Sequence, residues 1–175
     1  MHDALSAPTE HDLAPDDGWA PMGPWPFPHG KPGRFVVGDE DGDRYRIRYY
    51  RDAEDPERFH GKVWFGPGAE GPPLHAHGGS MAALLDEASG MACWVTETPV
   101  VAAQLTTKFH RMLPLGRVMR VEAHIHRRTA RRLLVRARIF DDLGDFASSE
   151  GQFAVVGEGL AGELARALER REGSG

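Results

Sequence analysis

The sequence predicts an α+β domain in which one long apolar helix packs against an antiparallel sheet. A proline-free stretch rich in alanine and leucine begins at Gly78, and four later segments alternate apolar with polar residues. Short stretches separate those segments, two of them containing glycine, proline or aspartate and the third an arginine-rich run. Strands, then a single long helix, then further strands are typical of α+β architecture. The 175 residues suffice for one domain with a sizeable core and are too few for two ordinary domains.

Residues 1–43 form a predicted proline-rich N-terminal arm. Proline lacks the backbone N–H and fixes φ, so we expect neither a helix nor a central strand in this segment. The arm also carries Trp19, Trp25 and Phe27, which would be stabilised by lying in a groove of the domain or of a partner chain. The sequence leaves a docked arm and a disordered arm both open.

Two strands and the long helix follow the arm. Apolar residues alternate with arginines over 44–49, and a second short strand is expected at 58–65. From Gly78 to about Val95 apolar residues recur at helical spacing, which predicts a helix about 25 Å long at 1.5 Å per residue. Pro99 ends it.

Four strands and a terminal helix complete the predicted domain. Connections at Pro114 with Gly116, at 127–131 and at 141–144 are short enough for hairpins. We therefore expect a folded body at 44–158 and a C-terminal helix and tail at 159–175, the helix spanning about 160–172. The predicted strands lie at 101–110, 119–126, 133–139 and 146–156.

Composition excludes several classes of protein. A net charge of -5, from 21 Lys+Arg and 26 Asp+Glu, lacks the positive field of a general nucleic-acid binder. The single cysteine, Cys93, cannot form an intrachain disulfide, which favours a reducing compartment. The first fifteen residues do not resemble a signal peptide, and no segment approaches the roughly 20 apolar residues of a membrane span. We expect a cytoplasmic protein that binds neither nucleic acid nor membrane.

A carboxylate in the middle of the predicted helix is the first candidate for chemistry. Asp86 and Glu87 are the only charged residues between Ser80 and Val95. A carboxylate removed from water without partners costs several kcal/mol, so a mid-helix acid on a core helix needs a reason. The residues that share its helical face are all small, which indicates a slot for a partner backbone or a ligand. They are Gly79, Ala82, Ala83, Ser89, Gly90 and Cys93. Glu87 is rotated by about 100° from Asp86, so we expect only one of the two acids in any one slot. The alternative for Asp86 is a satisfied polar residue at a subunit contact.

Two glycines open the helix after His77. Gly78 and Gly79 allow a ligand to approach free N–H groups where the helix dipole is positive, which suits a developing oxyanion. Asp86 lies eight residues further on, about 12 Å along the axis. One small carbonyl cannot touch both within a single straight helix. Two copies of the helix, or a ligand lying along it, are required, which favours a dimer with composite sites.

The run HGGSMAALLDEASGMA, His77 to Ala92, resembles the signature of hotdog-fold acyl-CoA thioesterases of the phenylacetate-pathway and thioesterase-superfamily type. The later text KFHRMLPLGRVMRVEAHIHRRTARRLLVRARIFDDLGDFASSEGQFAVV resembles the strands that follow in that family, so the similarity covers about Tyr45 to Val156. It implies a central helix wrapped by an antiparallel sheet, paired protomers, and a thioester bound between them.

The resemblance implies roles for individual residues. Gly78 would donate its N–H to the thioester carbonyl oxygen, and Gly79 would support the turn. Asp86 would activate water or attack the carbonyl itself, a choice that stays open. His77 would order the loop or bond near the carbonyl.

The resemblance also suggests binding residues. Arg111 and Arg132 fall where relatives often place basic residues near coenzyme A phosphates, although each could equally be an exposed strand-end arginine. Ala102 stands where several relatives carry a threonine or serine. Other side chains could orient the water instead, depending on strand register. These are Gln104, Thr106 and Thr107.

Rival sites are less specific. The pairs His75/His77 and His124/His126 have the spacing that puts two imidazoles on one side of a strand, but no third metal ligand is fixed by spacing, so we expect no metal. Cys93 on a small-residue helix face is expected to be an inert packing residue.

The sequence thus favours a homo-oligomer, a dimer or a tetramer, that hydrolyses an acyl-CoA thioester with no cofactor other than the coenzyme A moiety of its substrate. Three alternatives remain. They are a non-hydrolytic acyl-CoA or acyl-carrier binding protein, which the absence of a hydroxyl at Ala102 would favour, a hotdog 3-hydroxyacyl thioester dehydratase, and a structural interaction module.

Overall fold

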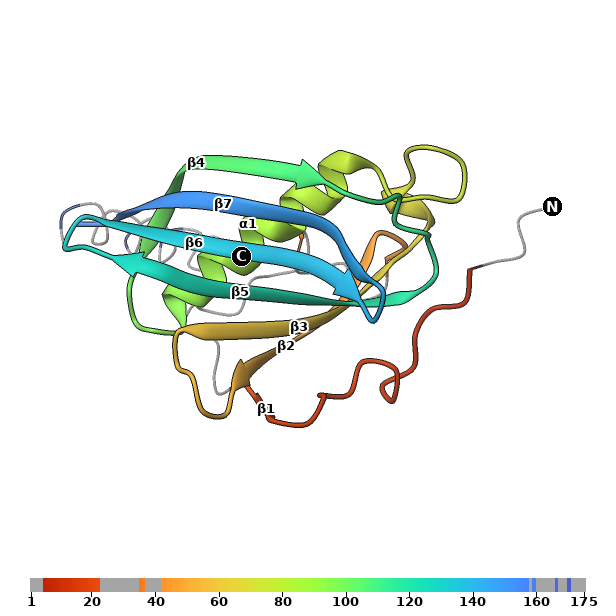
Figure 1. Ribbon diagram of the computed structural model, residues 1–175, viewed down its shortest axis with the longest axis horizontal. Helices are drawn as coiled ribbons and strands as arrows, with labels where there is room; N and C mark the ends of the chain where they lie inside the picture. Colours follow the sequence, from red (N-terminus) through yellow and green to blue (C-terminus); the bar gives the residue numbers. More distant parts are fainter. Residues whose placement is uncertain are drawn as a thin grey trace.

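A seven-stranded antiparallel sheet curves around one long helix, α1, in the computed structural model (Figure 1). The structure describes residues 5–22, 35–36, 42–157, 159, 166 and 170. The strand order is β1-β2-β3-β5-β6-β7-β4. The elements are β1 (Trp19–Pro21), β2 (Tyr45–Asp52), β3 (Arg58–Phe65), a 3₁₀ turn (Pro67–Ala69), α1 (Gly78–Trp94), β4 (Val100–Phe109), β5 (Val118–Arg128), β6 (Arg132–Asp141) and β7 (Gly144–Val155). The predicted α+β hotdog architecture, with one central helix wrapped by an antiparallel sheet, is confirmed.

The core lies between α1 and the concave face of the sheet. One side of the helix is buried, including Leu84, Leu85 and Ala88. Alternate residues of the central strands face it, because successive side chains in a strand point to opposite faces. β6, for example, buries Leu133, Val135, Ala137 and Ile139 while the residues between them face outward. Among the described residues no helix is both long enough and apolar enough to cross a membrane.

The predicted hairpin between the first two strands after the helix is wrong. β4 pairs with β7, and β5 pairs with β3 and β6. β7 and β6 lie between β4 and β5, so residues 110–117 must cross about 14 Å at 4.8 Å per strand, well within the roughly 26 Å reach of eight extended residues. Two backbone hydrogen bonds hold the crossing segment against the domain. Ala76 N–H donates to Leu113 O at 2.8 Å, and Gly116 N–H donates to Phe65 O at 2.8 Å. Leu113 is fully buried, which a solvent-facing hairpin turn would not allow.

β4 is therefore an edge strand, and much of it is exposed. Val101 retains 46% of its surface and Phe109 54%. The register against β7 shifts between Ala102 and Gln104, a bulge that changes which side chains face the helix. Among the described residues, this edge of the sheet thus presents apolar side chains and backbone groups without a neighbouring strand.

The described part of the arm is docked on the other end of the sheet. β1 pairs with β2, and Trp19 stacks on His60 with ring centroids 4.5 Å apart. Leu13 is buried, and the hydroxyl of Tyr50 donates to its carbonyl oxygen at 2.5 Å. Trp25 and Phe27 lie outside the described residues, as does the predicted C-terminal helix at 160–172 apart from two arginines. The boundaries proposed for arm, body and tail stay predictions.

Candidate active site between α1 and β4

The start of α1 is built by His77, which caps the helix. Its Nδ1 accepts a hydrogen bond from the N–H of Gly79 at 2.9 Å, so this nitrogen is unprotonated. A side chain at Gly79 would meet His77 Nδ1 at 2.8 Å, which explains the glycine. His77 therefore orders the loop, one of the two roles expected for it. It also occupies the Gly79 N–H, which is not available to a ligand.

The backbone N–H of Gly78, unlike that of Gly79, does not donate to His77. No hydrogen bond from Gly78 N–H to any described residue is present, as expected for the first residue of a helix. The ring of Phe109, at the end of β4, lies 3.4 Å from where a Cβ on Gly78 would be. The Gly78 N–H therefore lies where the start of α1 meets the end of the edge strand β4.

Asp86 lies further along the helix in a cavity of about 600 Å³. Its Oδ1 is buried and has no hydrogen-bond partner among the described residues. Burial raises the pKa of the Asp86 carboxyl above its ordinary value, because desolvation disfavours the charged form. A carboxylate with a raised pKa is a stronger proton acceptor once it is ionised. The cavity is lined by Phe35, Val36, Ala83, Asp86, Glu87, Gly90, Met91, Trp94, Val100, Ala102 and Phe153.

Both carboxylates line this cavity, which corrects the expectation that only one acid can face a slot. The cavity is wide enough to border two adjacent positions of the helix, so a 100° rotation does not remove Glu87 from it. The charge of Glu87 also contributes to raising the pKa of the buried Tyr49 hydroxyl, after desolvation. Asp86 therefore has an acidic neighbour at its cavity.

The strand register decides which β4 side chains accompany Asp86. Ala102 lines the Asp86 cavity, so the position without a hydroxyl faces the carboxylate. After the bulge, Thr107 pairs with the buried Ser149 and faces the helix side. Gln104 and Thr106 point to the other side of the sheet, away from Asp86 in the same chain.

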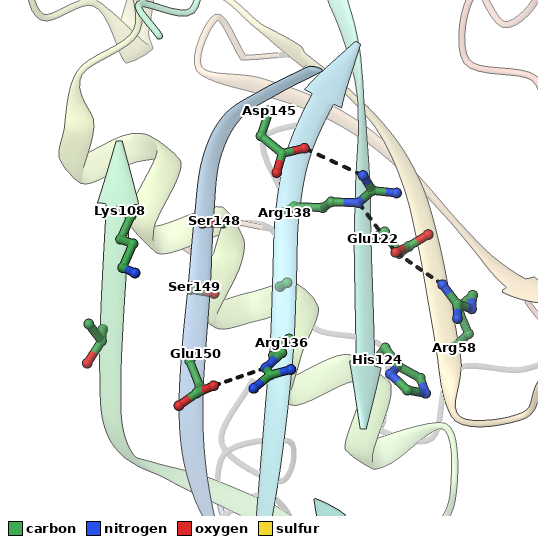
Figure 2. Close-up of a pocket in the computed structure, with 12 residues that line it drawn as sticks. Arg58, Lys108, Glu122, His124, Arg136, Arg138, Asp145, Ser148, Ser149 and Glu150 are labelled. Carbon is green, nitrogen blue, oxygen red and sulfur yellow. Dashed lines mark hydrogen bonds and ion pairs between the residues drawn. The ribbon is translucent and has the colours of Figure 1, made fainter. Parts of the chain in front are cut away.

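Thr106 lines a groove of about 610 Å³ on that outer face, where charged side chains are joined in ion pairs (Figure 2). Arg138 lies between Glu122 at 3.4 Å and Asp145 at 3.5 Å, and Arg58 also contacts Glu122 at 3.2 Å. These neighbours satisfy one another, so the groove has the character of a solvated sheet surface.

The two arginines expected near coenzyme A phosphates lie outside the Asp86 cavity, Arg111 in the crossing segment after β4 and Arg132 at the start of β6. Arg111 donates to Asp141 Oδ1 at 2.6 Å and to the carbonyl oxygen of Asp145, and its guanidinium lies 4.0 Å from the centroid of the Phe146 ring. It therefore braces the β6–β7 turn. Arg132 donates to Gln152 Oε1 at 3.2 Å on the outer face. Phosphate contacts by either residue stay predictions.

The rival sites can also be placed. His75 bonds the carbonyl oxygen of Pro73, and His124 lies beside the Figure 2 groove. Within the described ranges, no three His, Cys, Asp or Glu side chains are grouped closely enough to hold a metal ion. Cys93 is fully buried, and burial raises the pKa of its thiol to about 12, so it is uncharged at neutral pH.

Gly78 and Asp86 do not meet within one chain. They are eight residues apart on a helix without a described break, about 12 Å along its axis. Gly78 lies under the Phe109 end of β4, whereas the Asp86 cavity is bordered by Val100 and Ala102 near the other end. A single chain therefore supplies two half-sites, a donor and an acceptor.

Part of the chain is similar to known proteins. Residues 75–146 match the thioesterase superfamily. The acyl-coenzyme A thioesterase THEM5 of Mus musculus is 30% identical over 90 residues, which are 50% of this chain and 36% of that protein. The matched residues span α1 and the strands that follow it, the same part of the chain in which the sequence resembles hotdog-fold thioesterases.

Solved structures agree on the fold. The crystal structure of a thioesterase superfamily protein has a TM-score of 0.58 at 28% identity, covering 62% of this chain and 53% of that chain. A hypothetical thioesterase protein from Streptococcus pneumoniae, solved with coenzyme A, has a TM-score of 0.57 at 16% identity over 65% of this chain and 87% of that one, and shows the fold alone. This chain spans about a third of the length of the curated relatives it matches.

Proposed function

We propose that this protein is an acyl-CoA thioesterase, with Asp86 as the carboxylate that carries the reaction. The observation behind this proposal is the buried Oδ1 of Asp86, which borders a cavity and has no described hydrogen-bond partner. A structural acid would be satisfied by neighbours, because an unpaired buried polar atom is destabilising. The names of the two curated relatives, both acyl-coenzyme A thioesterases, support coenzyme A thioesters as the substrate class.

The reaction needs a donor that one chain does not bring to Asp86. We propose a homodimer that pairs along the exposed β4 edge, so that Gly78 of one copy faces Asp86 of the other. The Gly78 N–H then stabilises the oxyanion on the thioester carbonyl. Water attacks the carbonyl carbon as Asp86 takes its proton, and the C–S bond breaks to release free acid. The sulfur of coenzyme A leaves as a thiolate and takes up a proton, without any further cofactor.

A second route has Asp86 itself attack the carbonyl carbon, forming an acyl-aspartyl anhydride that water then opens. Single turnover in heavy-oxygen water tests for the anhydride. Label in the Asp86 carboxylate requires an anhydride that water opens at the aspartyl carbon. Label in the released acid alone is expected for activated water and also for an anhydride opened at its acyl carbon.

Non-hydrolytic acyl-CoA binding is the second candidate, since Ala102 brings no hydroxyl to the cavity where a water would be held. A panel of acyl-CoA substrates with free-thiol detection separates the two functions. Hydrolysis predicts thiol release by the wild type and a loss of about 10²- to 10⁴-fold in kcat for Asp86→Asn, the usual contribution of a general base. Asp142→Asn is the matched control, because Asp142 is an exposed acid on the β6–β7 turn. Binding of acyl-CoA without thiol release would overturn hydrolysis in favour of the binding function.

A further inference from the structure

The lining of the Asp86 cavity is predominantly apolar. Apart from the two carboxylates and Gly90, every residue that lines it is apolar. The apolar wall comes from the helix, the edge strand, β7 and the arm. Its members are Phe35, Val36, Ala83, Met91, Trp94, Val100, Ala102 and Phe153.

The cavity borders α1 from Ala83, about one turn before Asp86, to Trp94 at the C-terminal end of the helix. Gly90 and Met91 border it about one turn beyond the carboxylate, and Trp94 about two turns beyond, roughly 12 Å along the axis. A thioester carbonyl placed at Asp86 therefore has an apolar channel of this length on one side, and the coenzyme A moiety would extend away from that channel.

Two arm residues line this channel. Val36 is 6% exposed and belongs to the main core cluster, so this point of the arm is fixed to the domain. Phe35 borders the cavity but keeps 66% of its surface exposed, with the Arg44 guanidinium 5.1 Å from its ring centroid. A large apolar ring at the rim of an apolar cavity gains by being covered, and an apolar ligand in the channel would cover it.

We infer that the acyl group held by this site is an extended apolar chain, and that Phe35 and Val36 form the wall that selects it. The inference rests on the proposed function, because it assigns the acyl side of that same site. Asp86 and Glu87 sharpen the selection, since an acyl group that ends in a carboxylate would meet two like charges.

Steady-state hydrolysis of acetyl-, hexanoyl-, decanoyl- and succinyl-coenzyme A tests the selection. The expected order of kcat/KM is decanoyl above hexanoyl above acetyl, with succinyl lowest. Phe35→Ala should lower the ratio of decanoyl to acetyl kcat/KM about tenfold, the scale of losing part of an apolar pocket. Phe35→Leu should retain most of that ratio. Leu143→Ala is the matched control, because Leu143 is an exposed apolar residue of the β6–β7 turn that does not line the cavity.

A variant that fills the channel gives an independent result. A Cβ added at Gly90 meets no atom within 4 Å, so Gly90→Leu can be accommodated with its side chain in the cavity. It should remove the preference for decanoyl over acetyl, while circular dichroism and thermal unfolding show a folded protein. An unchanged preference in both Phe35→Ala and Gly90→Leu would overturn the inference.

Binding separates this inference from the proposed function. Calorimetry on Asp86→Asn compares decanoyl-coenzyme A with free coenzyme A, and the acyl compound should bind at least tenfold tighter. Equal affinity overturns the inference even if the wild type hydrolyses thioesters. Tighter binding that Phe35→Ala weakens supports it even if no thiol is released, an outcome that would instead count against hydrolysis.

Discussion

The burial of the Asp86 carboxyl affects both the stability of the fold and the reactivity of the site. Its folded-state pKa is raised by burial, so the fold favours the protonated carboxyl over the carboxylate. The stability that follows from this preference is complete below the ordinary aspartate pKa of about 3.9 and is lost as pH rises through the folded-state pKa. Catalysis by the carboxylate has the opposite dependence, because it requires the ionised form.

We therefore predict that Asp86→Asn stabilises the protein near neutral pH, by about 0.5–2 kcal/mol, while it lowers kcat by about 10²- to 10⁴-fold. Urea unfolding of both proteins across a pH series measures the difference, which should shrink towards zero in acid. In the wild type, kcat should rise over the same interval in which stability falls. A variant less stable than wild type at neutral pH would show that the carboxylate is paired in the native protein.

Substitutions of His77 test whether its role as a helix cap can be separated from a direct role in thioester hydrolysis. His77→Ala removes the acceptor for Gly79 N–H and should cost about 1 kcal/mol in unfolding free energy. His77→Asn supplies a good capping side chain and should restore stability. If His77 acts only by ordering the loop, His77→Asn restores kcat as well. Restored stability with kcat still low would assign the imidazole a direct role near the carbonyl.

At the scale of elements, β4 is where one copy should meet another. Its free edge and exposed Val101 allow pairing with a second chain, and lysine on an edge strand opposes such pairing. Val101→Lys should weaken dimerisation more than tenfold by sedimentation velocity and lower kcat in parallel, because each site needs both copies. Ala53→Lys, on the distant β2–β3 turn, should change neither. Full activity in a monomeric variant would refute the composite site.

The elements that the sequence predicted well are those whose signal is local. The helix begins at Gly78 as expected and ends one residue before the predicted end, and β3 has the predicted bounds, since periodicity and flanking breakers determine both. The partner of β4 depends on the crossing of 110–117, which no local pattern encodes. Likewise the bulge after Ala102 places Thr107, not Thr106, on the helix side.

The candidate site divides in the same way. Asp86 stood out from the sequence because a mid-helix acid among small residues is unusual on a core helix. Met91 and Trp94 could have been added from helical spacing, since they follow Glu87 and Gly90 on one side of α1. Phe35 could not, because its place at the cavity depends on how the arm meets a helix some fifty positions later.

For the molecule as a whole, the arm and the sheet are joined by polar contacts around His60. His60 is buried under Trp19, and its Nε2 lies 2.9 Å from Asp52 Oδ2. Lys62 adds an ion pair to Asp16 of the arm at 2.6 Å. Asp52 also accepts hydrogen bonds from two backbone N–H groups of the β2–β3 turn. The edge strand β1 therefore packs on the His60–Asp52 pair through Trp19, and the Asp52 carboxylate also binds the β2–β3 turn.

The hydrogen bond from His60, with backbone N–H donors, lowers the pKa of Asp52 to about 2. Because the folded-state pKa lies below the ordinary value, this stabilisation is present above about pH 4 and is lost as pH falls towards 2. Asp52→Asn keeps an oxygen for the turn but removes the charge, and should cost about 1.5 kcal/mol near neutral pH. The loss should diminish between about pH 4 and pH 2 in urea unfolding. Limited proteolysis should cleave the arm of the variant faster at neutral pH, because β1 is held next to this pair. A destabilisation that is the same at every pH would mean that the turn geometry, and not the charge on Asp52, secures the arm.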